Sequence, residues 1–427
     1  MLEASVTNAI PSKNLSDGAA ARLVLECVRR DLAPADTIGL ERDRIDAHGR
    51  PHRGFSAEDF AALDWDRVAL IAGHHGVLPL IYRRLQSASG VPTAALERMR
   101  ANFYGNALSS LHLARELVRL SAMLRAAGVA ALTFKGPALA LQAWGDPQLR
   151  QFNDLDLLVR PADAVRAARV LIAAGYWPRT FDPDAPAAAL AQAPGDEFMR
   201  PGSEWMIDLH WALMPAYFAG APGADAVWAR AVPITIDGAD LMTFGREDLI
   251  LFLAAHGAKH GWIGIGMIAD FARLIGAWPD AATPALIAAA QRAGGRRMLL
   301  LGVALAATVL EQRFGPAMAA AIRRDPLVAR LVAGVERRMF ASVAMRAHLY
   351  SDWMVPVTAI EGSRARARYL TGRALRPTID DVDFVALPPG LYPLYYAIRP
   401  LRLAWQQGRR MFVNVPHPLK RLRGSPR

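Results

Sequence analysis

Cysteine is almost absent from this chain of 427 residues. Cys27 is the single cysteine, so an internal disulfide is excluded and a reducing compartment is expected. The longest apolar run, residues 298–310, is flanked by charged residues and is too short to cross a bilayer. No N-terminal stretch combines the basic, apolar and cleavage regions of a secretory signal. We therefore expect a cytoplasmic protein without a transmembrane segment.

Several nucleotide-binding and hydrolytic motifs are also missing. The chain has no GxxxxGK[ST] loop, and no GxSxG or GxGxxG sequence stands in a suitable strand–helix context. Residues 256–260, His-Gly-Ala-Lys-His, have the histidine spacing of a helical zinc site, but Gly257 replaces the glutamate that a zinc protease needs as its base. His256, Lys259 and His260 instead share one helical face that suits an anion, and His256 alone would also fit a packed core position.

Lysine is scarce, because only four of the 50 cationic residues are lysines and the others are arginines. Two of the four, Lys135 and Lys259, stand in the two stretches whose composition is most typical of a site. A compact ammonium group suits a phosphate as a point charge, so both lysines are candidates for contacting a nucleotide. A lysine on the packing side of a helix needs a partner, which favours Lys259.

Residues 153–159, Asn-Asp-Leu-Asp-Leu-Leu-Val, form the most informative stretch that is present. In a strand, Asp154 and Asp156 point to one face while the apolar residues that alternate with them point to a core. Carboxylates this close repel each other unless water or a cation neutralises them, and such hard oxygen ligands suit Mg²⁺ or Mn²⁺. Asp208 lies in a second apolar strand. Three carboxylates on the strands of one small domain favour a metal site over a solvated edge strand.

The chain has the pattern of a small α/β unit around these residues. A strand at residues 129–134 precedes the turn Lys135-Gly136-Pro137, where Gly136 would let backbone N–H groups approach a phosphate at a helix N-terminus. The next expected elements are a helix at 138–144, a strand at 153–159, a helix at 162–174, a loop at 181–196 and a strand at 205–213. The last strand places Asp208 and His210 on one face.

Helical patterns occupy most of the remaining sequence. Ser56 is expected to cap a helix, and further helices are expected at residues 20–32, 247–260, 285–313 and 327–350. We therefore predict an α+β fold, in which a small mixed sheet with helices is flanked by N-terminal and C-terminal helical regions. The expected divisions are a loosely ordered lead (1–55), a helical region (56–128), an α/β domain (129–245), a helical domain (246–362) and a basic tail (363–427).

The positive charge is concentrated in that tail. Residues 363–427 hold 13 Lys and Arg against three Asp, a net charge of +10, while the whole chain has +11. A solvated tail is the simplest interpretation. The alternatives are a tail that binds nucleic acid, an acidic partner or an anionic membrane surface. The amphipathic stretch at residues 391–405 would dock on the body of the protein or on a membrane interface.

Around the strand with Asp154 and Asp156, the sequence resembles an uncharacterised bacterial nucleotidyltransferase family of the polymerase-β-like superfamily. The resemblance covers about residues 60–405. It is carried by residues 134–159 (FKGPALALQAWGDPQLRQFNDLDLLV), with further similar segments at 70–85, 207–211, 256–262 and 391–403. It implies a nucleotidyltransferase fold and transfer of a nucleoside monophosphate from an NTP to an acceptor, with two divalent cations.

The resemblance also implies roles for single residues. Asp154 and Asp156 match the paired metal ligands, and Asp208 looks like the third catalytic carboxylate. Gly136 takes the place of the glycine in the turn before the catalytic helix. Two features depart from the superfamily pattern: Pro137 follows the glycine, and the spacing from Gly136 to Asp154 is longer than usual. The candidates for nucleotide binding are Lys135, Gly136, Arg150, Lys259 and His260.

Three hypotheses follow for the function. The first is an enzyme that uses Mg²⁺ or Mn²⁺ and an NTP, with a peptide, a sugar or a small molecule as acceptor and Asp208 as base or base orienter. The second is a non-catalytic nucleotide-binding or scaffold protein of a biosynthetic gene cluster. The third is a peripheral membrane or nucleic-acid partner acting through the basic tail. The presence of all three carboxylates favours the enzyme.

Overall fold

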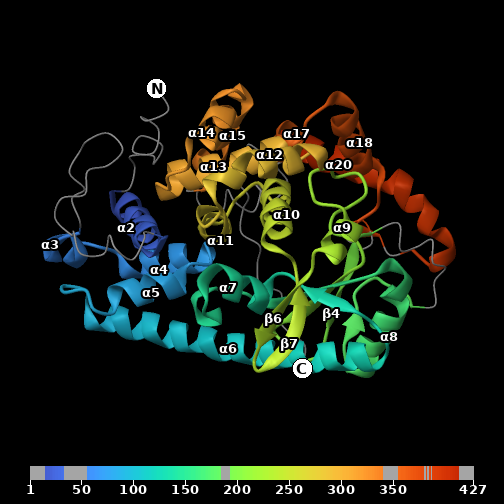
Figure 1. Cartoon of the computed structure of the whole chain (residues 1–427), viewed down its shortest axis with the longest axis horizontal. Helices are drawn as coiled ribbons and strands as arrows, with labels where there is room; N and C mark the ends of the chain where they lie inside the picture. Colours follow the sequence, from blue (N-terminus) through green and yellow to red (C-terminus); the bar gives the residue numbers. More distant parts are fainter. Residues whose placement is uncertain are drawn as a thin grey trace. The chain divides into compact units, whose positions relative to one another are not determined.

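The computed structural model describes residues 15–32, 55–183, 193–339, 354–378, 381, 384–385 and 387–412. The chain divides into two compact units, residues 1–363 (unit 1) and residues 364–427 (unit 2). The sheet and most of the helices belong to unit 1 (Figure 1).

Unit 1 contains a seven-stranded mixed sheet with the strand order β3-β4-β5-β2-β1-β7-β6. Its strands are β1 (Ala131–Thr133), β2 (Asp154–Val159), β3 (Trp177–Pro178), β4 (Gly195–Met199), β5 (Met206–His210), β6 (Val232–Ile236) and β7 (Ala239–Thr243). The pairs β2–β5 and β1–β7 are parallel, and the other neighbours are antiparallel. The two strands that carry the aspartates are therefore neighbours near the middle of the sheet.

The alternation of side chains divides β2 and β5 into an apolar face and a polar face. Leu155 and Leu157 of β2 and Ile207 and Leu209 of β5 are fully buried in one core cluster. Leucines of α6 (Thr93–Ala126) and alanines of α8 (Ala164–Ala173) complete that cluster. The aspartates consequently lie on the opposite face of the sheet.

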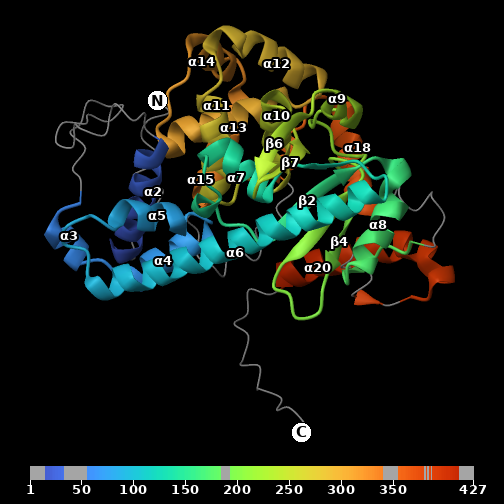
Figure 2. The same cartoon turned by 60° about the horizontal axis from the view of Figure 1, so that its bottom comes forward.

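Helices of the second half of unit 1 lie on the aspartate side. They include α10 (Arg246–Lys259), α11 (Ile265–Gly276) and α13 (Arg296–Leu310). Figures 1 and 2 both show α6 and α8 along one face of the sheet, with α10 and α13 on the other side. The apolar run at residues 298–310 makes up most of α13, and most of its side chains are buried. Among the described helices, none is long and apolar enough to cross a bilayer.

Each unit contains further helices. In unit 1 they are α2 (Leu15–Leu32), α3 (Ala57–Ala61), α4 (Trp65–His74), α5 (Leu78–Leu85), α7 (Gly136–Trp144), α9 (Ala224–Ala229), α12 (Thr283–Arg292), α14 (Pro316–Arg323), α15 (Pro326–Met339) and α17 (Met354–Ala359). Unit 2 follows with α18 (Ser363–Leu375), the 3₁₀ segment η6 (Pro389–Leu394) and α20 (Tyr395–Phe412). Ser56 caps α3 as expected, because its hydroxyl accepts the Asp59 N–H and the Asp59 carboxylate accepts the Ser56 N–H.

The structure confirms the α+β class and differs from the expected elements in several places. The helix expected at 285–313 is two helices, because Gly294 (φ +74°) ends α12 and a Cβ on Gly295 would meet the backbone of Gly220. The loop expected at 181–196 ends in β4, and strands β3, β4, β6 and β7 were not expected, while helix α11 lies within the predicted helical domain at 246–362. Residues 340–350 of the helix expected at 327–350 lie outside the described residues, as do residues 1–14 and 33–54 of the lead.

Candidate functional site

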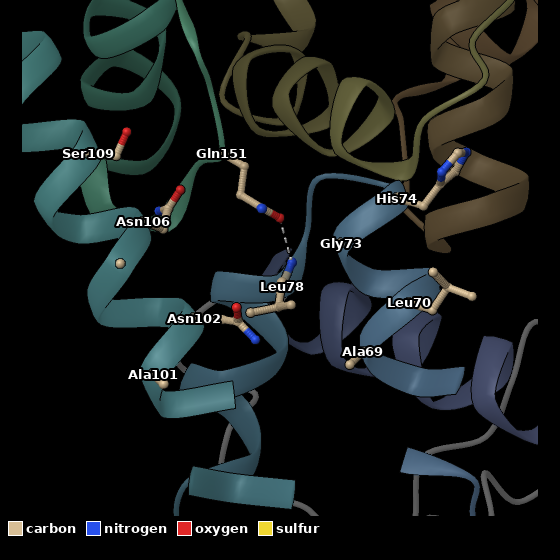
Figure 3. A pocket seen from close by; sticks show the side chains of 11 residues that line it. Ala69, Leu70, Gly73, His74, Leu78, Ala101, Asn102, Asn106, Ser109 and Gln151 are labelled. Atoms are coloured by element: carbon tan, nitrogen blue, oxygen red, sulfur yellow. Dashed lines mark hydrogen bonds between the residues drawn. The ribbon is translucent and has the colours of Figure 1, made fainter. Parts of the chain in front are cut away.

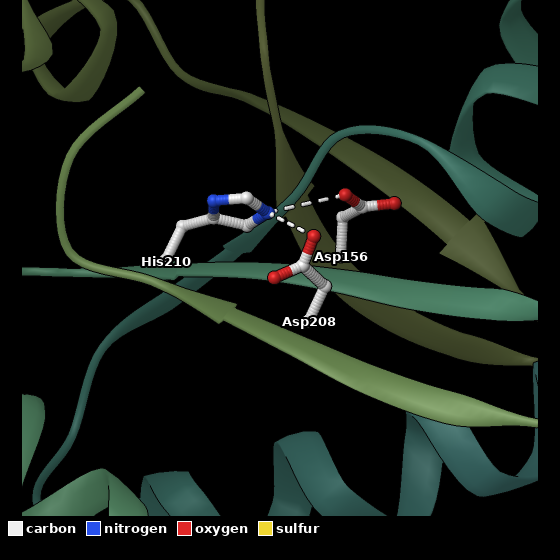
Figure 4. Close-up of side chains that lie close together, drawn as sticks. All are labelled: Asp156, Asp208 and His210. Atoms are coloured by element: carbon white, nitrogen blue, oxygen red, sulfur yellow. Dashed lines mark hydrogen bonds and ion pairs between the residues drawn. The ribbon is translucent and has the colours of Figure 1, made fainter. Parts of the chain in front are cut away.

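The register of β2 and β5 brings two of the three aspartates side by side. Asp156 pairs directly with Asp208 in the parallel ladder, so their side chains leave the same face of adjacent strands. His210, two residues further along β5, places its Nε2 atom 3.2 Å from Asp156 Oδ1 and 3.0 Å from Asp208 Oδ2 (Figure 4). One imidazole therefore links both carboxylates.

Lys135 adds a second positive group. It directly precedes α7, and its Nζ atom lies 2.5 Å from Asp156 Oδ1. Burial opposes the charge on Lys135, but the carboxylates of Asp156 and Asp154 outweigh burial and raise its pKa. Burial would likewise raise the pKa of the Asp156 carboxyl, but Lys135 and His210 hold that pKa below its ordinary value. Asp156 is thus a carboxylate at neutral pH.

The imidazole of His210 responds to the same charges. Burial alone would lower its pKa, but the carboxylates of Asp208 and Asp156 outweigh burial and raise the pKa to about 9. Its Nδ1 atom is buried and has no hydrogen-bond partner within the described part of the chain. His210 is therefore protonated between the two aspartates at neutral pH.

Asp154 occupies a different position from the other two aspartates. It is half-buried, and its carboxylate has neither a hydrogen bond nor an ion pair among the described residues. Burial, followed by the charge of Asp156, raises the pKa of Asp154. The tight cluster of metal-type ligands consists of Asp156, Asp208 and His210, whose ligand atoms all lie within 4.8 Å of one another. Asp154 lies beside this cluster and is not one of its members.

Gly136 lies where the sequence predicted a phosphate-binding turn. It begins α7 with a positive φ of +49°, and a Cβ at this position would stand 3.1 Å from the carbonyl oxygen of Asp154. No side-chain hydrogen bond caps α7, and Pro137 follows without an N–H of its own. The helix N-terminus is therefore packed directly against the start of β2.

Arg150 lies on the loop that leads into β2. Its Nε atom lies 2.7 Å from Asp270 Oδ2, and the Trp144 indole N–H donates to Asp270 Oδ1 at 2.8 Å. Burial opposes the charge of Arg150, but Asp270 and then Asp154 and Asp156 raise its pKa. Its Nη1 atom is buried without a hydrogen-bond partner in the described part of the chain. Arg150 thus stands within electrostatic reach of both β2 aspartates and retains a donor.

His256 of α10 and His260, which directly follows this helix, lie within electrostatic reach of Lys135. The rings of His256 and His260 lie 4.5 Å apart, and the His256 ring stacks on Phe252. Burial, and then the charges of Lys259 and Lys135, lower the pKa of His260 to about 3. Burial, His260 and Lys135 lower the pKa of His256 well below its ordinary value. Both imidazoles are neutral at neutral pH.

Lys259 itself is exposed, so it does not lie on the packing side of the helix as the sequence suggested. Phe134 connects the histidines of α10 to the aspartates, because it contacts Phe252, which stacks on His256, and also the ring of His210. Two residues of the site, His210 and Asp270, were not among the residues predicted to be catalytic, metal-binding or nucleotide-binding. Alternation along the strand expected at residues 205–213 already places His210 on the face of Asp208, but it does not show that the imidazole bonds to two carboxylates.

The donor atoms around Asp156 fit a divalent cation. Asp156 Oδ2 is buried and has no hydrogen-bond partner among the described residues, although a buried carboxylate oxygen normally has one. The Asp208 carboxylate is adjacent, and carboxylate oxygens are the ligands that Mg²⁺ and Mn²⁺ prefer. The residues present therefore suit the ion type that the sequence predicted.

A separate pocket of about 640 Å³ is lined by residues of α4, α5 and α6 and by Gln151 of the loop before β2 (Figure 3). Its polar lining includes the side-chain amides of Asn102, Asn106 and Gln151. Asn106 Nδ2 donates to the carbonyl oxygens of Gln148 and Arg150, and Gln151 Oε1 accepts the Leu78 N–H. These bonds fix the loop that carries Arg150 toward the aspartates.

Comparison with known proteins adds a family assignment. A family model described as "Uncharacterised nucleotidyltransferase" matches residues 61–311, which is more than half of the chain. The match includes all seven strands, the turn at Gly136, the three aspartates and the α10 histidines. The tail segment at residues 391–403 lies outside it. No curated protein matches the chain.

Proposed function

The chain belongs to a family of uncharacterised nucleotidyltransferases, and we propose that it transfers a nucleoside monophosphate from an NTP to a hydroxyl or phosphate of an acceptor. The observation that supports this proposal is the pairing of Asp156 with Asp208 across parallel strands, on the face of the sheet opposite α6 and α8. Asp154 stands two residues before Asp156 on the same face, beside the N-terminus of α7.

We assign roles to the carboxylates on this basis. Asp154 and Asp156 would hold a divalent cation, Mg²⁺ or Mn²⁺, together with the phosphates of the NTP, and Asp156 and Asp208 would hold a second cation. Bound there, the cations would stabilise the negative charge that develops on the attacking and leaving oxygens. Asp208 is the least enclosed of the Asp156, Asp208 and His210 cluster, with 28% of its side chain exposed, and is therefore our candidate base toward an acceptor hydroxyl.

The surrounding groups would orient the nucleotide. Gly136 at the N-terminus of α7 would present backbone to a phosphate, where the helix dipole favours negative charge. Lys135 and Arg150 would offset the charge of the pyrophosphate, because both lie within reach of the aspartates. Lys259 and His260 on α10 are further candidates for contacting the nucleotide. His210 is a positioning residue that holds Asp156 and Asp208 together.

We further propose a domain division that follows this assignment. The α/β domain at residues 129–245 would carry the chemistry, and the helical domain at 246–362 would form the opposite wall through α10. We propose a peptide, a sugar or a small molecule as the acceptor.

The test is transfer itself. The protein is incubated with each radiolabelled NTP and Mg²⁺ in a lysate of its host, and the labelled product is identified. We expect labelling to be lost in the double variant Asp156→Asn/Asp208→Asn and kept in Asp240→Asn, a strand aspartate of β7 that contacts Thr235. Full labelling by the double variant would rule out the mechanism. Tight NTP binding by calorimetry without transfer to any lysate component would favour a nucleotide sensor instead.

A further inference from the structure

Unit 2 contains a buried cluster of charges. Arg399 Nη1 lies 2.8 Å from Asp381 Oδ2, and Arg402 Nε lies 2.6 Å from Asp381 Oδ1. The Thr378 N–H also donates to Asp381, and Arg399 Nε donates to the carbonyl of Arg373. All three charged side chains of the cluster are at most 5% exposed. Helix α20 therefore turns its charged residues Arg399 and Arg402 inward.

Over residues 395–405, where its side chains are described, the outer side of the same helix is apolar. Leu401 is 70% exposed and Trp405, one turn later, is 51% exposed. Positions i and i+4 of a helix share one face, so these two side chains form a stripe. A surface helix of a globular protein normally has the reverse arrangement, with its apolar stripe toward the core. The polarity of α20 is thus inverted over the turns from Arg399 to Trp405.

The apolar surface extends beyond the helix. Phe384 is 48% exposed and its ring lies 5.9 Å from that of Trp405. Leu391 and Leu394 in η6 are 47% and 49% exposed. The segment η6 packs on α20, so these exposed side chains belong to neighbouring elements, and a contiguous exposed apolar patch marks an interaction surface. We call Phe384, Leu391, Leu394, Leu401 and Trp405 the apolar patch of unit 2.

The charge of unit 2 indicates what the patch contacts. Residues 364–427 hold 13 Lys and Arg and only three Asp, a net charge of +10. An anionic lipid surface is complementary to both the positive charge and the apolar patch of unit 2. Its headgroups attract arginines, and its acyl boundary accepts Leu and Trp side chains. A nucleic acid would match the charge, but its phosphates give leucine side chains no partner.

We propose that unit 2 binds the surface of an anionic lipid bilayer, with Leu401 and Trp405 in the headgroup–acyl boundary and the basic residues among the headgroups. The patch lies outside the region that matches the nucleotidyltransferase family, so membrane binding would be additional to the transferase activity. Attachment of this kind combines buried apolar area with electrostatic attraction, and it is reversible.

Vesicle flotation with the full-length chain tests the proposal. We expect the protein to float with vesicles of phosphatidylcholine and phosphatidylglycerol, to stay in solution with phosphatidylcholine alone, and to be released by added salt. Leu401→Ser/Trp405→Ser should weaken binding by about tenfold or more, because the charge that remains gives only weak attachment. The control is Leu108→Ser/Trp177→Ser, which changes the same residue types at 56% and 61% exposure in unit 1 and should bind as the wild type does.

Several outcomes would overturn the proposal. These are equal binding to both kinds of vesicle, no binding to either, or unchanged binding by Leu401→Ser/Trp405→Ser. Binding of RNA at the same salt that depends on Leu401 and Trp405 would assign the patch to nucleic acid. A change from dimer to monomer in the double variant would assign it to a second copy of the chain. If circular dichroism shows that the double variant is unfolded, Leu401→Ser alone provides the same comparison, because that side chain is the most exposed of the patch.

Discussion

Gly136 and Asp154 are in contact through the backbone at the point where α7 meets β2. A Cβ on Gly136 would stand 3.1 Å from the Asp154 carbonyl oxygen, and the φ of Gly136 is +49°. A backbone oxygen in a strand cannot move aside as a flexible side chain can. The contact therefore couples the position of the helix N-terminus to that of the first aspartate.

Gly136→Ala should consequently impair transfer more than stability. The left-handed conformation costs a non-glycine residue about 1–2 kcal/mol, and the clash would also move the turn away from Asp154. Gly145→Ala is the matched control, because Gly145 ends the same helix at φ +70° and a Cβ there would meet no atom within 4 Å. Both variants should lose similar free energy of unfolding in urea, and only Gly136→Ala should lose NMP transfer. Equal transfer rates in the two variants would contradict a role for the contact.

His210→Ala should lower kcat about ten- to hundredfold, as loss of a group that orients metal ligands commonly does. Without the imidazole, Asp156 and Asp208 repel each other across paired positions of β2 and β5. His210→Gln retains one N–H donor and should recover part of the rate. A steady-state comparison of kcat and KM for the NTP checks this prediction. A change in KM alone would instead indicate that His210 contacts the substrate.

Asp270→Asn should destabilise unit 1 by about 3 kcal/mol, because it leaves the buried charge of Arg150 without its partner. It should also raise the KM for the NTP, since the Arg150 side chain would lose the bond that aims it at the β2 aspartates. The control is Asp66→Asn, which removes the exposed ion pair with Arg98 and should cost less than about 1 kcal/mol. Urea unfolding gives both values, and similar losses in the two variants would show that burial of the Arg150 pair is unimportant.

The strand that carries Asp154 and Asp156 could be predicted from the sequence because its signal is local. Asp154 and Asp156 alternate with fully buried leucines, so the pattern alone gives the strand, the shared face and the nearby carboxylates. The parallel pairing that sets Asp208 beside Asp156 is a long-range property, and the sequence could supply only the expectation that the strands belong to one domain.

Other parts of the molecule could not be predicted for physical reasons. In β6, apolar and polar residues do not alternate in the sequence. Val232 and Pro233 are both exposed, because β6 is an edge strand of the sheet. The ion pair of Arg150 with Asp270 joins residues 120 positions apart, which no spacing rule reveals. Lys259 was expected on a packed face, yet α10 is buried nearly all round and the lysine stands at its exposed end.

His260 should make the stability of the fold depend on pH. Its pKa in the folded protein is about 3, against an ordinary 6.5, so between these values the unfolded chain binds a proton that the folded chain does not. The free energy of unfolding should therefore fall as the pH falls from 6.5 toward 3, and His260 should contribute a slope of up to about 1.4 kcal/mol per pH unit. Above pH 6.5 His260 should contribute no pH dependence.

His260→Gln should flatten the curve in this window. Lys259→Gln should flatten it partly, because the lysine charge contributes to the lowered pKa. Urea unfolding across this pH range measures the slopes, and parallel curves for the wild type and His260→Gln would show that His260 is protonated in the folded protein.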